Sequence, residues 1–122
     1  DFIDGKGGND HIWGLSASDC LVGGEGNDKV LGGSGEDLIW GNEGNDDLRG
    51  ESGHDKMWGG IGNDQMRGGS GDDKMYGEVG NDNMFGDAGG DLMDGGPNTD
   101  TLHGGTGTDN CQNEESSNSC EI

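Results

Sequence analysis

Large apolar side chains are scarce in this sequence. Leu, Ile, Val and Phe together account for 17 of the 122 residues, and aromatic residues make up 5%. A chain with so little apolar surface and a large net charge is normally disordered, because burial cannot offset the loss of chain entropy. Either the chain is disordered, or a source outside the polypeptide supplies the missing free energy of folding.

Basic residues and long apolar runs are also scarce. Six Lys and Arg residues stand against 26 Asp and Glu residues, which gives a formal net charge of −20. This sign excludes nucleic acid and anionic membranes as partners and favours cations. No apolar run approaches the roughly 20 residues that a membrane-spanning helix needs. The chain begins at Asp1 with neither a methionine nor a signal peptide, so we expect a processed or excerpted product.

Constellations that carry catalysis are missing from the sequence. We find no nucleophile beside a base, no open metal site and no carboxylate pair outside the repeat described below, so we expect no enzyme activity. His11, His54 and His103 occupy different positions of that repeat and cannot converge on zinc.

The chain is instead rich in glycine and aspartate, in a strict repeat of nine residues. From Gly5 to Gln112 it divides into twelve units without an insertion. The first position is glycine and the sixth is aspartate in every unit, and the fourth is glycine except at Ala17 and Asn98. The eighth position is always apolar: Ile12, Leu21, Val30, Ile39, Leu48, Met57, Met66, Met75, Met84, Met93, Leu102 and Cys111. We predict a six-residue turn and a three-residue strand per unit, with the eighth residue facing inward, so the five methionines fill a core.

The unit Gly23–Leu31, GGEGNDKVL, resembles the nonapeptide of the repeats-in-toxin (RTX, hemolysin-type) calcium-binding family. The resemblance implies an all-β fold, a right-handed parallel β-roll (β-solenoid) with two nonapeptides per coil and two short-stranded parallel sheets. A second period of eighteen residues supports two units per coil, because asparagine recurs at the fifth position of alternate units, at Asn9, Asn27, Asn45, Asn63 and Asn81. We expect a roll over residues 1–112, about 29 Å long at about 4.8 Å per coil, and a capping tail over residues 113–122.

The turns have the composition of a calcium site. Glycines allow positive φ angles that bring backbone carbonyls together, and the aspartate adds a carboxylate, so the oxygen cage suits Ca²⁺ better than Mg²⁺. The resemblance implies that each ion lies between two turns eighteen residues apart. The earlier turn gives its second and fourth carbonyls and its aspartate, and the later turn gives its first and third carbonyls and its aspartate.

Two sites carried over in this way use Gly24, Gly26 and Asp28 with Gly41, Glu43 and Asp46, and Gly33, Gly35 and Asp37 with Gly50, Ser52 and Asp55. The candidate metal-ligating aspartates are Asp10, Asp19, Asp28, Asp37, Asp46, Asp55, Asp64, Asp73, Asp82, Asp91, Asp100 and Asp109. The other candidate metal-site residues are Gly23, Gly24, Gly26, Gly32, Gly33, Gly35, Gly41, Glu43, Gly44, Gly50, Ser52, Gly53, Gly59, Gly60, Gly62, Gly68, Gly69 and Gly71.

The charge of the chain fits this number of sites. Six turns on each side leave five gaps per side, so we expect about ten Ca²⁺ ions, whose charge offsets the −20 of the polypeptide. Without calcium the columns of aspartates repel one another, so binding and folding are expected to be one event. Leu15 and Ala17 replace glycines, so the site shared by Asp19 and Asp37 is expected to be weak or empty.

Three cysteines indicate an oxidising compartment. Cys111 and Cys120 lie nine residues apart at equivalent inward positions, where a disulfide could close the capping tail, as in similar endings of free-standing secreted family members. Free thiols are the alternative. Cys20 lies about 24 Å away and points outward, so it is either free or joined to another molecule.

The outer faces of the two sheets differ in composition. Trp40, Trp58 and Tyr76 are eighteen apart, so we predict an aromatic ladder on one face. The opposite face carries polar residues at its centre: Asp47, Arg49, Gln65, Arg67 and Asn83. The ladder either stabilises neighbouring strands or forms a contact face for another copy, a preceding domain or a glycan.

These features predict a secreted, extracellular calcium-binding structural module. The alternatives are a filament or matrix protomer assembled by stacking of rolls, and an accessory domain of a secreted hydrolase. Ice binding is disfavoured because the asparagine rank and the serine rank (Ser16, Ser34, Ser52 and Ser70) lie on opposite sides of the expected roll.

Overall fold

The computed structural model describes residues 1–112, all of which lie in β-strands or in the turns between them. The strands are β1 (Phe2–Gly7), β2 (His11–Ser16), β3 (Cys20–Glu25), β4 (Lys29–Ser34), β5 (Leu38–Glu43), β6 (Asp47–Ser52), β7 (Lys56–Ile61), β8 (Gln65–Ser70), β9 (Lys74–Val79), β10 (Asn83–Ala88), β11 (Leu92–Asp94), β12 (Thr101–Thr106) and β13 (Asn110–Gln112). Within this range there is no helix long and apolar enough to cross a membrane.

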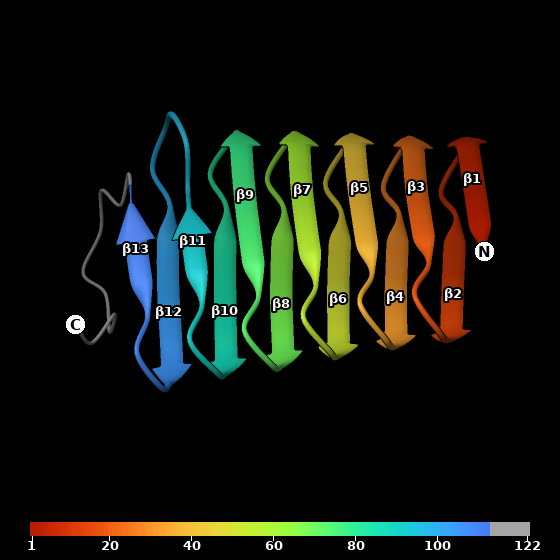
Figure 1. Ribbon diagram of the computed structural model, residues 1–122. Helices are drawn as coiled ribbons and strands as arrows, with labels where there is room; N and C mark the ends of the chain where they lie inside the picture. The colour runs from red at the N-terminus through yellow and green to blue at the C-terminus, as the bar shows by residue number, and fades with distance from the viewer. Residues whose placement is uncertain (113–122) are drawn as a thin grey trace.

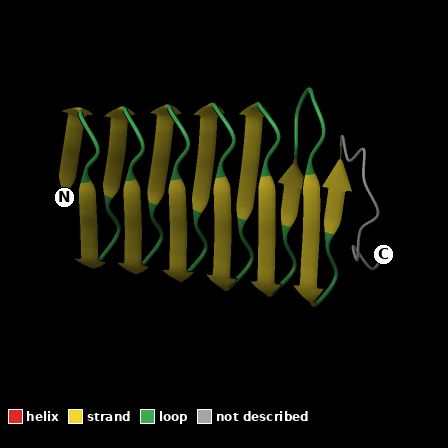
Figure 2. Cartoon of the chain, turned by 180° about the vertical axis from the view of Figure 1, so that it is seen from behind, coloured by secondary structure: helices red, strands yellow, loops and turns green. Residues whose placement is uncertain are grey.

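Alternate strands belong to two parallel sheets that face each other (Figures 1 and 2). The odd-numbered strands form a seven-stranded sheet in the order β1-β3-β5-β7-β9-β11-β13, and the even-numbered strands form a six-stranded sheet. Every registered pair is eighteen residues apart, as for Leu21 with Ile39 and Ile39 with Met57. The predicted parallel β-roll with two nonapeptides per coil is therefore confirmed.

The core is one row of side chains from each sheet. It consists of the eighth positions from Ile12 to Leu102, of which only Ile12 retains any exposure, at 5%. Ile3 and Cys111 are partly buried and pack against the two ends of this row. All five methionines are fully buried, which confirms that they fill the core.

The predicted strand length was wrong. Most strands have six residues, from the seventh position of one unit to the third position of the next, and only the short remainder of each unit is a turn. Pairing continues beyond the first-position glycine, as Gly24 registers with Asn42 and Glu25 with Glu43, although the second position has a positive φ. β11 has only three residues. Pro97, at the third position of the following repeat unit, has no amide hydrogen that could continue the strand pairing. The turn after β11 protrudes beyond its neighbours (Figure 1).

Each turn repeats the same backbone conformation. The second and fourth positions have positive φ in all twelve turns, whether or not they are glycine. Glycine at the fourth position avoids close contacts, because a Cβ at Gly26 would collide with the carbonyl oxygen of Gly8 in the preceding turn, but Ala17 and Asn98 take this place in two turns. The second position is glycine in only six turns, and the others carry Lys6, Leu15, Asn42, Glu51, Glu78 and Asp87. Along each side glycine alternates with a larger residue at this position, which is a period of 36 residues.

Candidate calcium centre

The sixth-position aspartates, called the turn aspartates below, are buried despite their charge. Eleven of them, from Asp19 to Asp109, expose 5% or less of their surface. They form two columns, one along each row of turns, because turns on the same side follow every eighteen residues. A buried carboxylate is costly unless both of its oxygens are paired, so the partners of these oxygens decide what the site can bind.

One carboxylate oxygen of each turn aspartate fixes the stacking of the turns. The amide of Asp28 donates to Oδ1 of Asp46 at 2.8 Å, and the amide of Asp46 donates to Oδ1 of Asp64 at 2.8 Å. Ten bonds of this kind, at 2.7–2.9 Å, link aspartates eighteen residues apart. The sequence pattern did not predict these bonds, because nothing in the spacing shows which atom an aspartate contacts.

The other carboxylate oxygen has no donor. Oδ2 is buried without a hydrogen-bond partner among residues 1–112 in Asp10, Asp19, Asp28, Asp37, Asp46, Asp55, Asp64, Asp73, Asp82, Asp91 and Asp109. A Cβ placed on Gly23 would lie 2.5 Å from Oδ2 of Asp28 and 2.9 Å from the carbonyl oxygen of Gly41, so these two acceptors converge over the first-position glycine. Two buried acceptors that face one space with no donor between them are costly, and a bound cation would satisfy both.

The carbonyl oxygens of several predicted backbone ligands face a neighbouring turn. The Gly26 carbonyl faces Gly44 in the next turn, and the Gly41 carbonyl faces back toward Gly23. The Glu43 carbonyl, a predicted third-position ligand, accepts from the Gly26 amide at 2.7 Å. The backbone carbonyl of Ser52, the equivalent predicted ligand on the other side of the roll, accepts in the same way from the Gly35 amide at 2.9 Å. A carbonyl oxygen has two lone pairs, so this bond leaves one for a metal.

Burial raises the pKa of the turn aspartates from Asp37 to Asp91. The pKa of Asp46, Asp55, Asp82 and Asp91 rises to about 6, and that of Asp64 and Asp73 to about 7. Loss of solvation is the largest cause, and repulsion from neighbouring carboxylates adds to it. The hydrogen bond from the amide of the preceding turn aspartate acts in the opposite direction. These aspartates are therefore harder to ionise in the metal-free columns than an ordinary carboxyl group, and a bound cation would favour their ionised form.

These donors fit calcium. They are all oxygens, carboxylate and carbonyl, and Ca²⁺ takes six to eight such ligands at about 2.3–2.6 Å. Among residues 1–112, no three side chains of His, Cys, Asp or Glu gather as a metal cluster, so a calcium site in these turns would need backbone carbonyls as well. Zinc prefers nitrogen and sulfur ligands, and both His11 and His54 are exposed.

An asparagine ladder runs beside one aspartate column. The backbone amide of Asn27 donates to the side-chain Oδ1 of Asn9 at 2.8 Å. The backbone amides of Asn45, Asn63 and Asn81 donate in the same way to the asparagine eighteen residues earlier, at 2.7–2.9 Å. The amide of Thr99 continues the ladder by donating to Asn81 at 3.0 Å. On the other side this position varies, and His54 Nδ1 accepts from the Asp72 amide at 2.8 Å. The eighteen-residue recurrence of asparagine was the signal of this ladder in the sequence.

The turn with Leu15 and Ala17 keeps the common conformation. Leu15 has φ 78° and Ala17 has φ 84°, in the left-handed region that residues with a side chain enter only at a cost. The Ala17 carbonyl still faces Gly35 in the next turn, as its counterparts do. The weakness expected of the site between Asp19 and Asp37 therefore rests on backbone strain, and it stays a prediction.

The cysteines lie at the places that the repeat indicated. Cys20 is a half-buried free thiol on the outer face of β3. Cys111 lies on β13, partly buried against the core. Cys120 and the capping tail are outside the described residues, so the Cys111–Cys120 disulfide stays a prediction.

The two outer faces differ as predicted. Trp40 and Trp58 stack with ring centroids 4.9 Å apart and planes inclined by 6°, and Trp58 and Tyr76 stack at 5.8 Å and 15°. These three rings are the aromatic ladder. The opposite face carries charged pairs, in which Arg49 contacts Asp47 at 2.9 Å and Lys29 contacts the same carboxylate at 3.3 Å.

Comparison with known proteins agrees with this geometry. No curated protein matches the chain. The model of the RTX calcium-binding nonapeptide repeat matches four times, at residues 1–30, 22–57, 58–93 and 76–111, which together span the described roll almost completely. The chain is therefore a β-roll of the RTX calcium-binding nonapeptide repeat family.

Proposed function

We propose that this chain is an extracellular structural module that folds on binding about ten Ca²⁺ ions between its stacked turns. The observation that carries the proposal is the buried Oδ2 atom of the turn aspartates, which faces a carbonyl oxygen with no donor between them. Family membership supports calcium as the ion.

Coupling of folding to binding follows from the composition of the core. The core has one row of side chains per sheet, and each coil adds buried carboxylates whose repulsion opposes folding. Calcium removes that repulsion and supplies attraction at the same place. Binding free energy then becomes folding free energy, as in other small metal-dependent domains.

A structural role outside the cell is supported by the repeat and by the acidity. In the turn aspartates, Oδ1 accepts the stacking hydrogen bond and Oδ2 is the proposed calcium ligand, so we assign these residues no catalytic role. A module that needs many calcium ions of moderate affinity suits the millimolar calcium of extracellular fluids.

Calcium counting tests the proposal. Equilibrium dialysis of the purified chain at saturating calcium should give about ten ions per chain, because six turns per side leave five gaps on each. Magnesium at the same concentration should not displace them. A stoichiometry of one or two ions would show that the aspartate columns are not the binding sites.

The aromatic ladder supports a second role, as a contact face for a partner. Trp40, Trp58 and Tyr76 remain half-exposed on the outer face of the seven-stranded sheet, where contiguous aromatic surface favours association. Substituting Trp40 and Trp58 by Thr should abolish self-association measured by sedimentation in calcium and leave calcium-induced folding largely intact. A wild-type chain that is strictly monomeric and binds no glycan on an array would leave the ladder with a structural role alone.

A further inference from the structure

The stacking of the aromatic ladder limits which ligands it can accept. In each stacked pair one ring covers the face of the next, at 4.9 Å between Trp40 and Trp58 and 5.8 Å between Trp58 and Tyr76. The middle ring therefore offers a ligand its edge and not its face. At the ends of the stack Val22 is in register with Trp40 and Asp94 with Tyr76, so a sugar that needs several exposed ring faces in a row is poorly served.

Beyond Tyr76 the next coil carries a carboxylate in place of a fourth ring. Asp94 of β11 is in register with Tyr76 of β9. Two residues further along the strands, Gly96 provides no side chain beside Glu78, because of the 36-residue alternation at the second position. The result is a hollow of about 270 Å³ lined by Trp58, Tyr76, Glu78, Asp94 and Gly96. We call it the Tyr76 hollow.

The lining of the Tyr76 hollow combines aromatic and anionic groups. Both rings are partly exposed: Tyr76 has one face that Trp58 does not cover and that can attract a cation, and the edge of Trp58 adds apolar contact. Glu78 is exposed, and the Asp94 carboxylate is held at the rim by accepting from the Gly96 amide at 3.1 Å. Neither carboxylate belongs to a turn aspartate, and neither is among the predicted calcium ligands. Lys74, on the same face of β9, is not among the lining residues.

A long side chain with a cationic end matches this lining, because its aliphatic stem can pack on the rings while its charge meets the carboxylates. We propose that the Tyr76 hollow binds a lysine or arginine side chain presented by a partner polypeptide. The proposal rests on the contact face proposed above and names the chemistry of its partner. It is independent of the calcium stoichiometry, which is measured separately.

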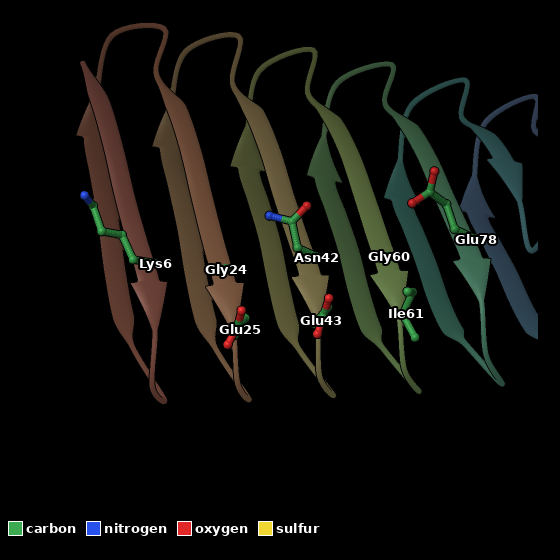
Figure 3. A pocket seen from close by; sticks show the side chains of 8 residues that line it. All are labelled: Lys6, Gly24, Glu25, Asn42, Glu43, Gly60, Ile61 and Glu78. Atoms are coloured by element: carbon green, nitrogen blue, oxygen red, sulfur yellow. The ribbon is translucent and has the colours of Figure 1, made fainter.

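A second hollow in the same sheet provides the matched control. It has a volume of about 440 Å³ and shares Glu78 with the Tyr76 hollow (Figure 3). Glu25 and Glu43 lie along it, so it carries carboxylates, but none of its lining residues is aromatic. Lys6 already brings an ammonium group to it. Acidity alone would make both hollows bind cations, whereas the proposal requires the aromatic one.

The experiment titrates Nα-acetyl-L-lysine amide into the calcium-loaded chain at constant ionic strength and follows the NMR signals of the Trp58 indole and of Tyr76. We expect saturable shifts of both signals in the millimolar range. The variant Glu78→Gln/Asp94→Asn removes two charges with little change of shape and should weaken binding at least about fivefold. The control Glu25→Gln/Glu36→Gln, which pairs one carboxylate of the second hollow with an exposed one outside both hollows, removes the same charge and should change affinity by less than about twofold.

Three outcomes would overturn the proposal. The first is the absence of saturable shifts with the lysine probe while the chain is folded in calcium by circular dichroism. The second is equal binding of the uncharged Nα-acetyl-norleucine amide, which would indicate an apolar contact only. The third is equal weakening in both double variants, which would indicate general acidity. Saturable shifts with cellobiose and none with the lysine probe would assign the ladder to a glycan instead.

Discussion

The two oxygens of each turn aspartate have different partners. Oδ1 accepts from the backbone amide of the turn aspartate eighteen residues earlier, as Asp46 does from Asp28 at 2.8 Å. Oδ2 of Asp46 is buried without a donor in the described part of the chain. A single side chain therefore fixes the stacking of two turns and presents a charged acceptor to the space between them.

Replacing a turn aspartate is expected to damage the roll in proportion to the sites it serves. Asp46→Ala removes a ligand from two sites with undamaged turns, whereas Asp19→Ala acts on a turn already strained at Leu15 and Ala17. We expect Asp46→Ala to raise the calcium midpoint of folding about tenfold or more, corresponding to about 1.4 kcal/mol, and Asp19→Ala to raise it clearly less. Calcium titrations followed by circular dichroism measure both midpoints, and equal midpoints would contradict sites shared between stacked turns.

Relief of strain at Ala17 should stabilise the roll. Its φ of 84° lies in the left-handed region, where glycine is tolerated and alanine is not favoured. Ala17→Gly should therefore increase the free energy of unfolding in saturating calcium by about 1 kcal/mol, in spite of the entropy that glycine adds to the unfolded chain. The control is Ala88→Gly at the end of β10, where φ is not positive, and it should be neutral or destabilising. Urea unfolding of the three proteins provides the comparison.

Which residues form the candidate site could be predicted from the sequence, but their contacts could not. Aspartate at every sixth position and glycine at most fourth positions were enough to indicate an oxygen cage. The amide bond to Oδ1, and the bond from Gly26 to the predicted ligand Glu43, depend on how two turns stack. Composition and spacing carry no information on those atoms.

Each strand is held by more than its ladder of backbone bonds. β5, β7 and β9 are joined by inward Ile39, Met57 and Met75 and by the outward aromatic ladder. The turns after them are joined by the asparagine ladder. The eighteen-residue period of the sequence predicted which strands are neighbours. It did not predict strand length, because glycine in the first positions looked like turn while its backbone pairs as strand.

The asparagine ladder should contribute measurably to stability. The side-chain Oδ1 of Asn45 accepts from the backbone amide of Asn63 at 2.7 Å, and the backbone amide of Asn45 donates to Oδ1 of Asn27 at 2.8 Å. Asn45→Ala removes the first bond while the residue stays exposed, so we expect a loss of about 0.5–1.5 kcal/mol in saturating calcium. Gln65→Ala, at an exposed position of β8, is the control and should cost less than about 0.5 kcal/mol. Equal losses in urea unfolding would show that the ladder is only a geometric repeat.

At the scale of the whole molecule, the aspartate columns oppose folding until a cation is bound. The folded metal-free pKa of Asp64 and Asp73 is about 7, against an ordinary value of 3.8, so the metal-free roll binds more protons than the unfolded chain between these values. The stability of the metal-free roll therefore falls as pH rises through that window. At neutral pH the aspartates destabilise the metal-free roll the most.

This linkage predicts the proton balance of calcium binding. If calcium folds an unfolded chain, the aspartates start with ordinary pKa values near 3.8 and are already ionised at about pH 6. Calcium-induced folding should then release almost no protons at that pH, and the calcium requirement should rise only below about pH 5. Calorimetry in two buffers with different ionisation heats measures the release. Release of several protons per chain would instead indicate a preformed metal-free roll whose aspartates titrate near 6 to 7.

The most direct test of coupled folding and binding is far-UV circular dichroism of the purified chain at neutral pH, first in excess chelator and then in millimolar calcium. The account predicts a disordered spectrum in chelator and a β-rich spectrum in calcium, with a cooperative transition that magnesium does not reproduce. A β-rich spectrum that persists in chelator would contradict it, because the roll would then be stable without the ions that its buried aspartates are proposed to bind.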